Sequence, residues 1–150
     1  MTTIKINLYY IISDFKILAA KLCERLIKDR YKILIKVGSK TEEKELDDYF
    51  WSYEDYSFLP HRTAIDPFDN DEKIVILNED KEENFLDKGF NTLIISPTVV
   101  KTKISDSYNH FFFSYLSEKN NFEIENNKLK KTRFIVKTLI EEKNQKWKIY

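Results

Sequence analysis

The sequence predicts one α/β domain in which helices cover both faces of a mostly parallel, mixed sheet, a Rossmann-like fold without a glycine-rich nucleotide loop. Stretches with the two-residue apolar period of strands alternate along the chain with stretches of helical period. The chain has 150 residues, of which 42% are hydrophobic, and this is enough for one domain with a core. No repeat or low-complexity linker divides it. We therefore expect a single domain over residues 1–150 that ends in a tail at about 142–150.

The N-terminal segment predicts a strand followed by a long helix. Residues 4–9 alternate apolar and polar side chains, which is typical of a half-buried strand. Residues 13–31 carry apolar side chains at helical spacing, and either Ser13 or Asp14 is suited to cap this helix.

A second strand and a second helix follow directly. Residues 32–37 are rich in β-branched side chains and end at Gly38, which predicts a short strand. Residues 42–51 predict a helix, because Thr41 is a plausible N-cap and glutamates occupy the first turn, where the helix dipole favours negative charge. The resulting order, β-α-β-α, is typical of a parallel sheet.

The second half of the chain begins with a loop, because two prolines punctuate residues 52–72. Residues 73–77 and 91–95 then predict two buried strands. The aromatic side chains of residues 109–116 favour another strand over a helix. Residues 126–141 predict a last helix with a broad apolar face.

Three features favour a cytosolic protein. No apolar run reaches the roughly 18 residues that a membrane helix needs. The first residues lack the basic region and the cleavage site of a secretory signal. The one cysteine, Cys23, cannot form an internal disulfide, which fits a reducing compartment.

The net charge is zero, but the charges are unevenly distributed. Residues 1–41 hold nine Lys or Arg and three Asp or Glu, whereas residues 42–91 hold five basic and sixteen acidic side chains. Residues 118–150 are basic again, with nine basic and five acidic side chains. Such asymmetry indicates either separate faces for separate partners or two ordinary solvated faces.

The sequence offers little for catalysis, and we expect no cofactor and no metal. Neither glycine-rich nucleotide fingerprint occurs. His61 and His110 are 49 residues apart, and Cys23 falls near the apolar face of its helix, where a core thiol is expected. His61 with Asp47 or Asp48 could act as a base with its orienting carboxylate, but no serine or cysteine is placed as a nucleophile.

The aromatic side chains of residues 46–61 divide between core and surface. Leu46, Tyr49 and Phe50 fit one helical stripe, and Trp51 falls at its edge. Trp51 is therefore either a half-buried lid on the core or a wall of a surface groove. The proline at position 60 forces the preceding residues into an extended conformation, so one of Phe58 and Leu59 is expected to point outward.

This same block carries a specific pattern, LDDYFWSYEDYSFLPH, in which a helix end with Leu-Asp and Trp51 precedes Ser-Phe-Leu-Pro-His after a five-residue spacer. Other segments agree with it, namely INLYYI, KILAAKLCERLIKDRYKILIKV, TLIIS and KTRFIVKTL. Together they resemble the chi subunit of the bacterial DNA polymerase III clamp-loader complex. The resemblance covers about residues 3–137.

The resemblance implies a non-catalytic adaptor in DNA replication. Such an adaptor joins the clamp loader, through the psi subunit or another clamp-loader subunit, to single-stranded DNA-binding protein, whose acidic C-terminal tail ends in Phe. It meets DNA only indirectly, at replication forks in the bacterial cytoplasm, and is a monomer when alone. Matched residue by residue, the tail site consists of Trp51, Lys130, Lys131, Arg133 and Phe134. The surface for the clamp-loader partner consists of Phe58, Pro60 and His61.

Two alternative functions stay open at this point. One is a single-stranded nucleic-acid-binding domain that uses the basic C-terminal helix with aromatic stacking. The zero net charge argues against it, because phosphate binding usually needs a basic excess. The other is a small hydrolase centred on His61.

Overall fold

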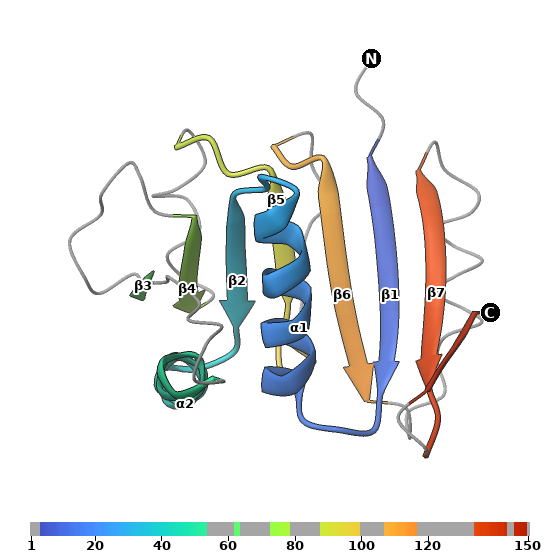
Figure 1. Cartoon of the computed structure of the whole chain (residues 1–150), viewed down its shortest axis with the longest axis horizontal. Coiled ribbons are helices and arrows are strands. Elements are labelled where there is room, and N and C mark those ends of the chain that lie inside the picture. Colours follow the sequence, from blue (N-terminus) through green and yellow to red (C-terminus); the bar gives the residue numbers. More distant parts are fainter. Residues whose placement is uncertain are drawn as a thin grey trace.

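Among the residues that the computed structural model describes, one mixed sheet of eight strands is accompanied by two helices (Figure 1). The described residues are 4–53, 62–63, 73–78, 88–99, 107–116, 134–143 and 146–149. The elements are β1 (Lys5–Ile11), α1 (Phe15–Lys28), β2 (Ile33–Val37), α2 (Lys40–Ser52), β3 (Arg62–Thr63), β4 (Ile74–Asn78), β5 (Thr92–Ile95), β6 (His110–Leu116), β7 (Ile135–Glu141) and β8 (Trp147–Ile149).

The strands lie in the order β3-β4-β2-β5-β6-β1-β7-β8. All neighbours pair in parallel except β7 and β8, which are antiparallel. The predicted α/β class with a mostly parallel sheet is therefore confirmed. The strands expected at 4–9, 32–37, 73–77 and 91–95 and the helices expected at 13–31 and 42–51 are all present, and the aromatic segment at 109–116 is a strand, as its composition favoured.

α1 and α2 cover one face of the sheet (Figure 1). The core on this face joins side chains of both helices to alternate residues of the strands, such as Ile33, Ile35 and Val37 of β2. The intervening Leu34 belongs to a second buried cluster on the opposite face, with Leu8 of β1. A parallel sheet that is buried on both faces is typical of a three-layer α/β domain.

The helix predicted over residues 126–141 is wrong for the part that the structure describes, because residues 135–141 form strand β7. Four of these seven residues are β-branched, and they pair in parallel with β1, so that Val136 lies opposite Ile6 and Thr138 opposite Leu8. This pairing satisfies the backbone groups at the side of β1 that faces away from β6. The segment expected as a tail also contains a strand, β8, which extends the sheet beyond β7.

Both helix starts are fixed close to where the sequence placed them. Asp14 is the N-cap of α1, although its side chain makes no capping hydrogen bond. α2 begins earlier than expected, because Ser39 rather than Thr41 is the N-cap and accepts a hydrogen bond from the backbone N–H of Glu42. Just before it, Gly38 approaches Thr98 so closely that a Cβ would lie 2.6 Å from the Thr98 hydroxyl. No helix among the described residues is long and apolar enough to cross a membrane.

Candidate functional site

The C-terminal turn of α2 presents Trp51 to solvent. Phe50 is fully buried and Leu46 nearly so, one turn earlier on the same stripe. Trp51 lies beside this stripe and is 57% exposed. A large aromatic side chain with this much exposed surface is more typical of a contact for a partner than of a lid on the core.

The turn that carries Trp51 is held firmly against α1. The Tyr53 hydroxyl donates a hydrogen bond to the Glu24 carboxylate at 2.9 Å. The Tyr49 and Tyr53 rings lie 5.9 Å apart, and the Lys16 ammonium sits 5.6 Å from the centre of the Tyr49 ring. Trp51 is therefore presented on a rigid element, which lowers the entropy cost of binding through it.

The structure does not bring Trp51 and Phe134 together. α2 packs over β2 and β4, whereas Phe134 immediately precedes β7 and packs against the core cluster on the opposite face. β5, β6 and β1 lie between β2 and β7. Four inter-strand spacings amount to roughly 19 Å across the sheet. These two residues cannot form the two walls of one small pocket.

The other predicted site residues fall outside the described part of the chain. They are Phe58, Pro60 and His61 of the partner surface and Lys130, Lys131 and Arg133 of the tail site. Their roles stay predictions, as does the His61-centred hydrolase. The nucleic-acid alternative depended on a basic C-terminal helix, and that helix is replaced by β7 over residues 135–141.

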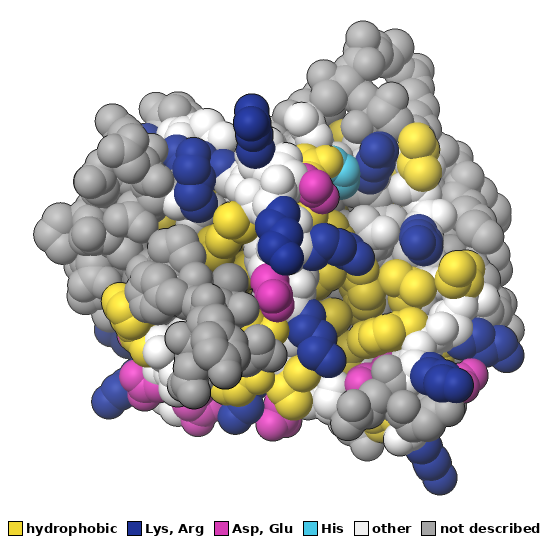
Figure 2. All heavy atoms as spheres, viewed as in Figure 1, with side chains coloured by type: hydrophobic (Ala, Val, Ile, Leu, Met, Phe, Trp, Pro, Cys, Tyr) yellow, Lys and Arg dark blue, Asp and Glu magenta, His cyan; other side chains and the backbone are white. Residues whose placement is uncertain are grey.

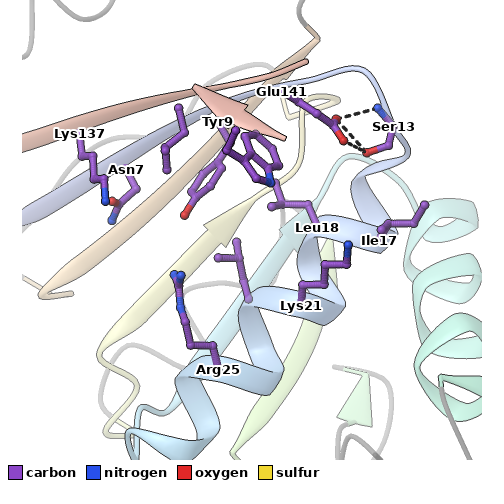
Figure 3. A pocket seen from close by; sticks show the side chains of 12 residues that line it. Asn7, Tyr9, Ser13, Ile17, Leu18, Lys21, Arg25, Lys137 and Glu141 are labelled. Atoms are coloured by element: carbon purple, nitrogen blue, oxygen red, sulfur yellow. Dashed lines mark hydrogen bonds between the residues drawn. The ribbon is translucent and has the colours of Figure 1, made fainter. Parts of the chain in front are cut away.

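The described residues contain a groove that the sequence did not predict. It lies between α1 and the C-terminal strands and has a volume of about 390 Å³. Its floor is hydrophobic, and Lys and Arg side chains flank it on both sides (Figure 2). Lys21 and Arg25, one turn apart on α1, face Lys137 of β7 across it (Figure 3). Its apolar lining consists of Tyr9, Ile17, Leu18, Leu22, Leu139 and Trp147. We call this the α1–β7 groove.

Two aromatic side chains shape one end of the α1–β7 groove. The rings of Tyr9 and Trp147 meet edge to face with centres 5.4 Å apart, although they are 138 positions apart in the chain. Burial raises the pKa of Tyr9, while Arg25 beside the hydroxyl acts in the opposite direction. The phenol is therefore neutral near pH 7 and able to donate a hydrogen bond.

The same end is closed by Glu141, the last residue of β7. Its Oε1 accepts hydrogen bonds from the backbone N–H groups of Ile12 at 2.8 Å and Ser13 at 2.9 Å, and the Ser13 hydroxyl lies 2.9 Å from both carboxylate oxygens (Figure 3). Burial would raise the pKa of Glu141, but the hydrogen bonds from Ser13 and Ile12, together with the charge of Lys21, hold it below its usual value. Glu141 is thus ionised and ties β7 to the start of α1.

The groove continues toward the N-terminal ends of the strands. A second hollow shares Asn7, Arg25 and Lys137 with it and reaches His110. The Tyr31 ring packs edge-on against His110, with ring centres 4.7 Å apart. Burial, and to a lesser extent the charge of Lys5, lowers the pKa of His110.

Nothing in the described residues assembles a reactive centre. Cys23 is fully buried, and burial raises the pKa of its thiol, which makes it an inert core residue as the sequence indicated. No group of three or more His, Cys, Asp or Glu among the described side chains could hold a metal ion.

Glu42 accepts hydrogen bonds from Gly38, Ser96 and Thr98, and these hydrogen bonds hold the start of α2 against the end of β5.

The α1–β7 groove could not be predicted from the sequence, because its walls lie far apart in the chain. Lys21 and Arg25 were visible as an i, i+4 pair on the polar side of a predicted helix. Lys137, however, was assigned to a helix, and a helix at this position gives no reason to place it opposite α1. The pairing of β7 with β1 supplies that reason.

Comparison with known proteins agrees with the family resemblance found in the sequence. The family model of the DNA polymerase III chi subunit, HolC, matches residues 5–132, which is most of the chain. The match begins with β1 and ends before β7 and β8. A search of curated proteins gave no match. On the strength of the family match, this chain belongs to the DNA polymerase III chi subunit family.

Proposed function

We propose that this protein is a non-catalytic adaptor that links the clamp loader to single-stranded DNA-binding protein at bacterial replication forks, in the cytoplasm. Membership of the chi family makes it an accessory subunit of DNA polymerase III. The observation that carries the adaptor role is Trp51, a large aromatic side chain that is exposed on a rigid helix within the family-matched region.

The proposal assigns the two partners to two different surfaces. Trp51 is seven residues before Phe58 in the chain. We assign Trp51, together with Phe58, Pro60 and His61, to the clamp-loader partner, which is psi or another subunit. This revises the tail site that the resemblance implied, because Trp51 and Phe134 lie on opposite faces of the sheet.

The acidic tail of single-stranded DNA-binding protein is assigned to the basic segment of Lys130, Lys131 and Arg133, which runs into Phe134. Cations would pair with the tail's carboxylates, and Phe134, half-buried at the start of β7, would offer apolar surface to its last side chain. Charge-assisted hydrogen bonds of this kind contribute about 1.5 to 3 kcal/mol each.

Binding measurements with both partners from the same organism test the proposal. Trp51→Ala should weaken clamp-loader binding about 30-fold or more while leaving the tail of single-stranded DNA-binding protein bound. Arg133→Ala should weaken binding of the tail of single-stranded DNA-binding protein about tenfold to a hundredfold and leave the clamp-loader partner bound. Asp48→Ala, an exposed change on α2, is the matched control for Trp51. If the wild-type chain retains neither partner, the adaptor proposal fails.

A further inference from the structure

The α1–β7 groove combines apolar walls with positive charge that no ion pair among the described residues neutralises. Among the described residues no carboxylate lies within ion-pair distance of Lys21, Arg25 or Lys137. Glu141 lines the groove too, but its charge is engaged by the N–H groups of Ile12 and Ser13. Three cations around an apolar lining favour a ligand that carries both negative charge and apolar side chains.

We propose that this groove binds a short, extended, acidic peptide segment with aliphatic side chains, contributed by a protein partner. None of the described residues that line this groove belongs to the two surfaces assigned above, and the proposal does not depend on those surfaces. Its outer wall is formed by β7 and β8, which lie beyond the residues that match the chi family.

The length of the groove fits an extended segment. Together with the adjoining hollow, its lining follows α1 and its C-cap from Ile17 to Asp29. Twelve residues of helix rise about 18 Å. An extended chain covers this distance with about five residues.

The walls favour a peptide over a single-stranded nucleic acid. Bases bind by stacking on open aromatic faces. Tyr9 is only 5% exposed, and Trp147 packs edge to face against it. The remaining apolar lining is aliphatic, including Leu18, Leu22 and Leu139, and it matches leucine or isoleucine side chains better than flat bases.

The outer strand adds exposed apolar surface next to the groove. Trp147 is 38% exposed and Ile149 is 67% exposed. Ile149 is paired with Leu139, so both point to the same face of the sheet as the groove. A bound segment would cover this surface, which is otherwise costly to leave in water.

The test uses the full chain and a fluorescein-labelled synthetic peptide in which three acidic residues are followed by two leucines. Fluorescence anisotropy should show saturable binding that weakens as salt is added. Replacing the leucines by serines, or the acids by their amides, should each weaken binding at least tenfold. A labelled oligothymidylate of similar length should bind at least tenfold more weakly than the peptide.

Variants locate the site. Lys21→Ala combined with Arg25→Ala should weaken peptide binding at least thirtyfold. Lys28→Ala combined with Lys40→Ala, two exposed positions outside the groove, removes the same charge and should change it less than threefold. Thermal unfolding of both double variants checks that they are folded.

Three outcomes would overturn the proposal. One is no peptide binding up to about 1 mM, the weak end of the affinity range for protein ligands. Another is an equal loss of peptide affinity in the Lys21→Ala, Arg25→Ala variant and in the Lys28→Ala, Lys40→Ala control. The third is loss of binding in Arg133→Ala but not in the groove variant, which would place the peptide at the tail site.

Discussion

The hydrogen bonds of Glu141 join the last residue of β7 to the segment between β1 and α1, and their removal is a sharp test of the C-terminal part of the fold. Three of the four contacts use one carboxylate oxygen, Oε1. In Glu141→Gln a carbonyl oxygen can keep these three contacts, and only the charge is lost. In Glu141→Ala the N–H groups of Ile12 and Ser13 lose their carboxylate acceptor.

The expected magnitudes follow from this difference. A hydrogen bond to a charged group contributes about 1.5 to 3 kcal/mol, and the lower end applies here because Glu141 is partly exposed and screened by solvent. We expect Glu141→Gln to lower the free energy of unfolding by about 1 kcal/mol and Glu141→Ala by about 2 to 3 kcal/mol.

The effect should depend on pH. The pKa of Glu141 is lower in the folded protein than the ordinary value of 4.5, so the folded state binds fewer protons than the unfolded state around this pH. The stabilisation by the charge is therefore present above pH 4.5 and is lost as the pH falls through the lowered pKa of the folded state. The difference in the free energy of unfolding between the wild type and Glu141→Gln should therefore disappear in acid.

Urea unfolding of the wild type and both variants, at neutral pH and in acid, measures these differences. Glu142→Gln, at the exposed neighbouring position, is the control for loss of a charge alone. The reasoning is refuted if Glu141→Ala unfolds within about 0.5 kcal/mol of the control, the range expected for surface substitutions. It is also refuted if the gap for Glu141→Gln is unchanged in acid.

Other predictions concern the core and the second hollow. Phe50→Ala should lower the free energy of unfolding by about 3 to 5 kcal/mol and its exposed neighbour Trp51→Ala by less than about 1 kcal/mol in urea unfolding; similar values would contradict their opposite burial. The pKa of His110 is lowered, so the unfolded state binds more protons and stability should fall as the pH drops below 6.5; this dependence should be weaker in His110→Gln, and an unchanged dependence would assign it elsewhere. Cys23 should react with a thiol reagent only as fast as the protein unfolds, whereas rapid reaction of the native protein would show that the thiol is accessible.

The core strands could be predicted because their local pattern and their tertiary environment agree. Residues 33–37 are a continuous run of mainly β-branched side chains, and all five are buried in the middle of the sheet. Likewise, the four-residue spacing of Leu46 and Phe50 placed both on the buried stripe of α2 and left Trp51 beside it.

β7 could not be predicted from local pattern. Phe134, Ile135 and Leu139 have a spacing that fits a helix face, and the lysines between them fit its polar side. What decides the conformation is β1, more than 120 residues earlier in the chain, whose backbone groups on one side pair with β7. Non-local pairing of this kind overrides local propensity, and it also sets where Lys137 and Glu141 lie.

The arrangement of the sheet bears directly on an adaptor role. Trp51 lies on α2, which packs over β2 and β4, whereas the α1–β7 groove lies on the side of α1 that faces away from α2. Both lie on the same face of the sheet. The parallel strands between them are buried on both faces, so the distance between the two surfaces is fixed by backbone hydrogen bonds rather than by flexible side chains. A partner held through Trp51 and a peptide held in the groove would therefore not compete for the same side chains. The crossover from β1 through α1 to β2 places α1 between the two surfaces.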